Sequence, residues 1–224
     1  MDVRNGIEVR LSSGLTPAEA DEVRALVAAS PAGSYLQQPD WPELCPPPPR
    51  HRYVGLRAYL GQELIGWAQV RLSPLAAGFR LASLRRGPVT MDIETLRLVV
   101  PAFAGALARH HVCSMVVNPR WSGPAADEAT RCLAALGATV LPDRAQTIHR
   151  TTLLADLSGT PADLRGRLKQ RCRRQIARCE KMGLQVRPAA SVDEAMLYEP
   201  VLQGFHRRRG LPTDAIPPFP GSGK

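Results

Sequence analysis

The sequence predicts an α+β fold in which helices pack on a mixed sheet, and three observations support this. Two strand-like runs, 53–60 and 63–72, are separated by Gly61-Gln62, a strong β-hairpin signal. Thr16 and Glu19 have the spacing of a capping box and predict a helix from 16 to about 29. An amphipathic helix from Asp92 to His110 and the apolar run 112–117, which predicts a buried strand, indicate a short parallel or mixed element after the hairpin.

The remaining elements follow from periodicity and from helix and turn signals. Alternation of apolar and polar residues predicts a strand at 7–11, and a third strand of the meander is expected at 79–84, ending at Arg85-Arg86-Gly87-Pro88. A helix is expected from Gly123 to Leu136. Further along, we expect strands at 138–141, 147–157 and 184–187, a basic helix at 160–183 and a helix that opens at Ser191.

Composition narrows the class of protein. The chain has 224 residues and 44% hydrophobic residues, enough for a substantial core, but only 5% aromatic residues, which argues against stacking platforms for single-stranded nucleic acid. We see no transmembrane segment and no secretory signal, and therefore expect a cytoplasmic protein. The five cysteines form no C-x-x-C pair, so no metal site is predicted.

Positive charge is concentrated in the segment 164–186. Eight Lys or Arg and one Glu give this segment a net charge of +7, out of +9 for the whole chain. Thr160, Pro161 and Asp163 mark a helix start, and Gly183 marks its end. On one continuous helix, an apolar stripe would face the core, and most of the cations would cluster on one flank. The residues of the apolar stripe are Leu164, Leu168, Cys172, Ile176 and Cys179.

The basic helix has two interpretations. One is an ordinary solvated face that keeps the protein soluble. The other is a site for an anionic partner, favoured because the segment stacks like charges and lacks the acids that usually alternate with them.

Several motifs in their order along the chain resemble the FemABX family of aminoacyltransferases. The stretch 169–186, KQRCRRQIARCEKMGLQV, is similar to the family pattern K-x-x-x-R-R-x-I-x-x-A-x-K-x-G-V. Weaker similarities are the Tyr35–Trp41 loop, Leu64-Ile-Gly66, Arg86-Gly87-Pro88, Leu153–Leu157 before the basic helix, and Phe205–Pro212. The resemblance covers nearly the whole chain.

The resemblance implies two GNAT-like (acetyltransferase-like) subdomains. The first would span 1–150, and a partial second, containing the basic helix, would span 151–215, followed by a disordered tail at 216–224. The second subdomain is shorter than in the family, so we expect a truncated second half.

The resemblance also implies a function. We expect transfer of an activated amino acid to an amine of a peptidoglycan precursor peptide, UDP- or lipid-linked, with peripheral contact to a membrane surface. The co-substrate would be aminoacyl-tRNA, and no bound cofactor is expected. A helical hairpin that some members place near the tRNA is not evident, which leaves acyl-CoA as an alternative donor. Two alternative functions stay open: a GNAT-type acyl-CoA N-acyltransferase on another amine, and a non-catalytic phosphate- or RNA-binding fragment.

Candidate site residues follow from this chemistry. Acyl transfer needs cations for phosphates, a proton acceptor and donors for the oxyanion. We expect substrate contacts from Lys169, Arg173, Arg174 and Arg178 of the basic helix, from Arg86 of the strand-ending turn, and from Trp41 of the early loop. No residue is assigned as the catalytic base.

Overall fold

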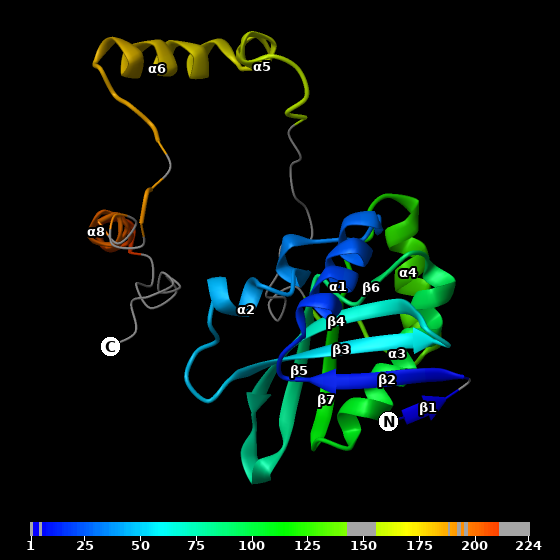
Figure 1. The fold of residues 1–224 in the computed structure, drawn as a ribbon. Helices are drawn as coiled ribbons and strands as arrows, with labels where there is room; N and C mark the ends of the chain where they lie inside the picture. The colour runs from blue at the N-terminus through cyan, green and yellow to red at the C-terminus, as the bar shows by residue number, and fades with distance from the viewer. Residues whose placement is uncertain are drawn as a thin grey trace. The chain divides into compact units, whose positions relative to one another are not determined.

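The structure, a computed structural model, describes residues 2–4, 6–142, 156–187, 189–191, 194 and 197–210 (Figure 1). The described residues fall into two compact units, one up to residue 142 and the other from residue 156, and each is described by itself. The expected subdomain boundary at 150/151 and the tail at 216–224 lie outside the described residues and stay predictions. Among the described residues, no helix is both long and apolar enough to cross a membrane.

The first unit is built on one mixed seven-stranded sheet. Its order is β1-β2-β3-β4-β5-β7, and β6 pairs with β4. All neighbouring strands are antiparallel except β5 and β7, which are parallel. The strands are β1 (Asp2–Arg4), β2 (Ile7–Ser12), β3 (Arg52–Leu60), β4 (Glu63–Pro74), β5 (Arg80–Arg85), β6 (Val89–Thr90) and β7 (Val112–Asn118). The predicted α+β class, with an antiparallel meander and a parallel element, is confirmed.

The helices α1, α3 and α4 of the first unit begin where the sequence predicts, whereas the short helix α2 lies in a stretch expected as a loop. Thr16 and Glu19 form both hydrogen bonds of the capping box at the start of α1. The Asp92 side chain accepts a hydrogen bond of 2.7 Å from the backbone N–H of Thr95 at the start of α3. The α-helices are α1 (Pro17–Ala29), α2 (Trp41–Leu44), α3 (Ile93–Ala108) and α4 (Pro124–Ala135), and two 3-10 turns are η1 (Tyr35–Gln37) and η2 (Ala76–Gly78).

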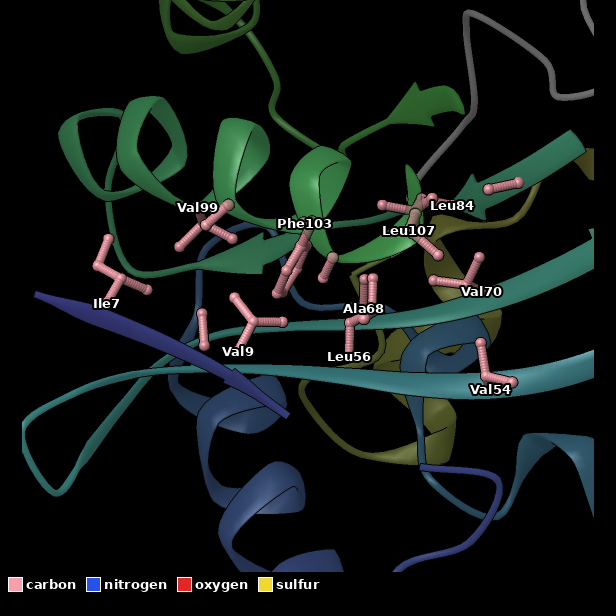
Figure 2. Close-up of a cluster of buried hydrophobic side chains, with 14 of the residues drawn as sticks. Ile7, Val9, Val54, Leu56, Ala68, Val70, Leu84, Val99, Phe103 and Leu107 are labelled. Carbon is pink, nitrogen blue, oxygen red and sulfur yellow. The ribbon is translucent and has the colours of Figure 1, made fainter. Parts of the chain in front are cut away.

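Helices cover both faces of the sheet. On one face, Phe103 and its neighbours on α3 pack against alternate residues of the strands, as Figure 2 shows; Val54, Leu56, Val70 and Leu84 are among these strand residues. On the opposite face, α1 packs on Tyr59, Leu64 and Trp67. Helix α4 packs on α3 through a third apolar cluster. Burial of these apolar side chains is the dominant force that holds the unit together.

The structure corrects two expectations in the first unit. Strand β7 is not a fully buried strand: within the described residues it lies at the edge of the sheet, and Cys113 and Ser114 are exposed. Residues 138–141 form no strand. The strand expected at 147–157 lies almost entirely outside the described residues.

The second unit contains α5 (Pro161–Arg167), α6 (Gln170–Lys181) and α8 (Glu199–Arg209). The expected single helix is therefore wrong, because Leu168 and Lys169 have extended ψ angles of 145° and 146°. A continuous helix would place Arg165 beside Lys169 and Arg167 beside Arg171, four residues apart, and like charges at this spacing destabilise a helix. The break at Leu168 separates them.

Two further expectations for the second unit fail. Residues 184–187 form no strand. The apolar stripe expected to face the core is instead exposed, with Ile176 at 36% and Leu168 at 39%. At Ser191 the side chain accepts a hydrogen bond from the backbone N–H of Glu194, as a helix start requires, but several residues that follow lie outside the described residues.

Candidate functional site

Helix α1 packs on one half of a sheet face, and the other half of that face is polar. Because side chains alternate along a strand, the register places Tyr53, Arg71 and Ser83 side by side on three neighbouring strands. Arg85 lies on the same face, two residues beyond Ser83, and its partner in the parallel β7 strand is Asn118. The residues between them point into the α3 core. The buried side of helix α1 covers only the Trp67 half of this face.

Strands β4 and β5 separate at this polar region, and the side chain of Gln37 fills the gap. Its Nε2 donates to the carbonyl of Arg85 at 2.6 Å, and its Oε1 accepts from the backbone N–H of Gln69 at 2.7 Å. The Gln37 side chain is fully buried and so takes the place of a neighbouring strand's hydrogen bonds. This glutamine holds η1 and the following loop against the polar half of the sheet.

A sharp turn follows β5 and carries the predicted site residue Arg86. Arg86 has a φ of 56°, and Gly87-Pro88 is a cis peptide bond. A Cβ on Gly87 would lie 2.7 Å from Gln37 Nε2, so only glycine fits here. The backbone N–H of Asn118 donates to the Gly87 carbonyl at 3.1 Å, which places this turn beside the carboxyl end of β7. Arg86 is half-buried and lies next to the polar face.

A small cavity of about 10 Å³ lies over the polar face, with space for about one water-sized group. Trp41, at the first position of α2, is one of its walls, and its ring lies edge-on to the ring of Tyr35 at 5.4 Å between centroids. The residues that line the cavity are Leu36, Trp41, Tyr53, Gln69, Arg71, Ser83 and Arg85. The predicted residue Trp41 therefore lines a cavity, and Arg86 directly follows a residue that lines it.

Several buried polar atoms in this region have no hydrogen-bond partner. They are Arg71 Nε, Arg85 Nε and Asn118 Oδ1. Buried polar groups in folded proteins are nearly always paired, so these atoms are available as hydrogen-bond partners for a ligand or water. Sequence reasoning missed Arg71 and Arg85. One signal could have revealed them. Polar Gln69 and Arg71 alternate with apolar residues along the same strand, which indicates that one face of this strand is polar.

The other predicted residues lie on the basic segment of the second unit. Arg165 forms a two-bond ion pair with Glu180 at 2.8 and 2.9 Å, and Arg173 Nη1 donates to the Gly166 carbonyl at 3.1 Å. These contacts join α5 to α6 across the break. Because Arg173 already binds a carbonyl of α5, it holds the corner between the two helices.

The remaining cations of α6 share one face. At about 100° per residue, Arg171, Arg174, Arg178 and Lys181 lie within roughly 80° of one another, on the side away from Cys172, Ile176 and Cys179. All four are exposed, as is Lys169 at the corner, and among the described residues none forms an ion pair or a hydrogen bond through its side chain. Lys169, the N-cap residue, lies on another flank of the helix; for brevity we call the four cations together with Lys169 the α6 cation face. It contains three of the four predicted basic residues.

We assign no residue to the catalytic step. The cavity of the first unit is lined by no His, Asp or Glu. Within the part of the chain that the structure describes, no group of three or more His, Cys, Asp or Glu could hold a metal ion. The predicted site residues fall into two sets, one in each unit: Trp41 and Arg86 beside the cavity, and Lys169, Arg173, Arg174 and Arg178 around α6.

The sequence matches no family model, and no curated protein matches it. Solved structures do match. The crystal structure of FemX has a TM-score of 0.73 at 18% identity, and the match covers 92% of this chain and 51% of FemX. This chain therefore spans about half the length of that protein.

Two acetyltransferases match more weakly. An aminoglycoside acetyltransferase, meta-AAC0020, from an uncultured soil metagenomic sample has a TM-score of 0.44 at 12% identity over 67% of this chain and 98% of its own. A ribosomal-protein-alanine N-acetyltransferase from Brucella melitensis biovar Abortus 2308 has a TM-score of 0.38 at 17% identity over 65% of this chain and 99% of its own. Scores this low carry no weight beside that of FemX. The chain thus shares the fold of FemX, as its motifs predict.

Proposed function

We propose that this chain belongs to an aminoacyltransferase that joins an activated amino acid to an amine of a peptidoglycan precursor peptide. One observation carries the proposal: the match to the fold of FemX covers 92% of the chain, with a TM-score of 0.73. We expect aminoacyl-tRNA as the co-substrate and the cytoplasm as the compartment.

The α6 cation face supports a substrate with phosphates. Guanidinium groups bind phosphate oxygens through paired hydrogen bonds, and Lys adds a mobile point charge. Both the tRNA donor and a UDP- or lipid-linked acceptor carry phosphates. We propose that Lys169, Arg174 and Arg178 contact these phosphates directly. Arg173 acts by holding the corner between α5 and α6 in place.

The reaction would form one amide bond and break one ester bond. The neutral amine of the acceptor attacks the carbonyl carbon of the aminoacyl ester, the tRNA hydroxyl leaves, and the amine proton passes to the leaving oxygen or to a base. Such a step depends on holding amine and ester together, which can supply much of the rate enhancement. The chain's own contribution in this proposal is to bind and orient the phosphate-bearing parts of the substrates.

The direct test is an assay for the new amide. The protein is incubated with charged tRNA and either UDP-linked or lipid-linked muropeptide, and the product is detected by mass spectrometry. Parallel reactions with acyl-CoA test the alternative donor. An amide formed only from acyl-CoA would replace the tRNA-dependent proposal, and tRNA binding without any amide would favour the non-catalytic binding module.

Variants test whether phosphate binding depends on the α6 cation face or on the total positive charge of the chain. The triple variant K169Q/R174Q/R178Q should weaken tRNA binding and lower the slope of log affinity against log salt by about two, since each phosphate contact contributes about 0.7–0.9. The control R52Q/R97Q/R109Q removes the same charge from the first unit and should leave that slope nearly unchanged. Equal slopes for the two variants would exclude the α6 cation face as the phosphate site.

A further inference from the structure

Arg71 and Arg85 line the same cavity, on neighbouring strands, without an acidic partner. Both side chains are half-buried, and the Nε atom of each is buried without a hydrogen-bond partner. Among the described residues, no Asp or Glu forms an ion pair with either side chain. Two cations therefore line one confined space, and no carboxylate from the part of the chain that the structure describes balances them.

Other arginines of the same unit show what is missing. Arg57 is buried on the same face of the sheet, and its Nε also lacks a hydrogen-bond partner, but its charge is balanced by an ion pair with Glu19 of α1. Arg24 binds Asp21 and Asp40, each at 2.7 Å. Arg57 and Arg24 thus have carboxylate partners, whereas half-buried Arg120 donates to the Gly33 carbonyl and Arg71 and Arg85 have no carboxylate partner among the described residues. Leaving a partly desolvated charge unpaired is costly, and two like charges in one cavity add repulsion. An anion between Arg71 and Arg85 would remove both costs.

The lining of the cavity indicates which anion fits. The space, about 10 Å³, has room for about one water-sized group, so it admits one oxygen of a carboxylate while the rest of the ligand stays outside, and it is too small for a phosphate with its four oxygens. The guanidinium fork matches a carboxylate in plane and spacing, and the hydroxyls of Tyr53 and Ser83 line the same space and can donate further hydrogen bonds. Leu36 and Trp41 provide an apolar wall for the rest of a ligand.

We propose that Arg71 and Arg85 bind a carboxylate group of a peptide ligand. The identification of the ligand as the acceptor peptide rests on the function proposed above; the carboxylate site itself rests only on the geometry of the first unit. The site is distinct from the α6 cation face, so one chain would have separate subsites for carboxylate and for phosphate.

The test uses the full chain and three probes: acetate, N-acetyl-trialanine with a free C-terminal carboxylate, and the same peptide as its amide. Binding is followed by NMR through the side-chain Nε–H resonances of arginine, together with calorimetry. We expect acetate and the free peptide to shift the Nε–H signals of Arg71 and Arg85 saturably. We expect the amide to bind at least about 10-fold more weakly, because charged hydrogen bonds are lost.

Variants then assign the effect. R71Q and R85Q should each weaken binding of the free peptide by about 10- to 100-fold, whereas R97Q, an exposed arginine on α3, should not change it. R71K and R85K retain charge and serve if a glutamine variant fails to fold; they should bind the peptide with intermediate affinity, because lysine lacks the fork.

Three results would overturn the proposal: no saturable shift with acetate or peptide, equal binding of the acid and the amide, or tighter binding of inorganic phosphate than of the free peptide. None of these measurements involves tRNA or amide formation. A positive carboxylate test with a negative transfer assay would therefore reject only the proposed function, and the reverse result would reject only this site.

Discussion

Helices α1 and α5 begin with nearly the same local sequence and differ in everything that packs on them. Each starts after a Thr cap followed by Pro-Ala, and each forms a complete capping box, with Glu19 in one and Asp163 in the other. Helix α1 then buries Val23, Leu26 and Val27 against the sheet. Helix α5 has no buried residue. Capping residues thus determine where a helix begins, and burial depends on partners distant in the sequence.

The same contrast holds for the two units. In the first unit, apolar side chains from helices and strands meet in three clusters. In the second, large apolar side chains are exposed, including Val186, Val201 and Phe205. Hydrophobic stabilisation should accordingly be concentrated in the first unit, and the following predictions test this difference, from the largest expected effect to the smallest.

The largest effect is expected from truncation of a core side chain. Phe103 is fully buried at the centre of the α3 cluster (Figure 2), so F103A should lower the free energy of unfolding by about 3–5 kcal/mol. I176A removes an exposed side chain of α6 and should change it by less than about 0.5 kcal/mol. Urea unfolding followed by tryptophan fluorescence measures both. Comparable losses in the two variants would show that Ile176 is packed as well as Phe103.

The next largest effect is expected at Glu19, which joins the cap of α1 to the sheet. The backbone N–H of Thr16 and the Arg57 guanidinium lower the pKa of Glu19 from its ordinary 4.5 to about 2. Because the pKa is lower in the folded chain, the ionised carboxylate stabilises the fold above about pH 4.5, and this contribution is lost as the pH falls towards about 2.

The variant E19Q tests this linkage. It leaves the buried Arg57 charged without its partner, so it should be destabilised at neutral pH. The difference between wild type and E19Q should be constant above about pH 4.5 and shrink as the pH approaches 2. The measurement is the free energy of unfolding across that pH range, with E43Q on α2 as a charge-matched control. A difference independent of pH would contradict the role of the carboxylate.

Gln37 tests whether the polar half of the sheet depends on one side chain. Q37L keeps a similar volume but leaves the Gln69 N–H and the Arg85 carbonyl without partners, which should cost about 1–3 kcal/mol. The loss should be accompanied by faster amide exchange at Gln69. Q38L, one residue along the same loop, serves as the control. If the two variants were equally stable, water would be satisfying these groups.

The sequence allowed prediction of features that depend on near neighbours. The turn at Gly61-Gln62, the caps at Thr16 and Asp92 and the polar turn after β5 are all local, and all are confirmed. The cavity is not local. Arg71 and Arg85 meet because β4 and β5 pair in one particular register, with Gln37 inserted where they separate. A charge in a strand-like run gives no register, so the pair was missed.

The basic segment shows the opposite error. Its periodicity predicted one helix with a buried stripe, since an amphipathic pattern normally implies a core-facing side. The structure instead breaks the helix at Leu168, and Arg165 crosses the break to reach Glu180. Repulsion between cations four residues apart competes with helix propensity, and a periodicity count does not include this term. The clustering of cations on α6 itself followed from the sequence.

The smallest effects should come from the two caps. T16A removes a cap whose helix is packed on the sheet, and it should lower the free energy of unfolding by about 1 kcal/mol. T160A removes the equivalent hydrogen bond in α5, whose residues are not buried. Its loss should leave the global unfolding midpoint unchanged and instead speed amide exchange within residues 161–167, because an unpacked helix opens locally. If T160A lowered the midpoint as much as T16A, α5 would unfold together with the first unit. The two helices would then not differ in how strongly packing holds them.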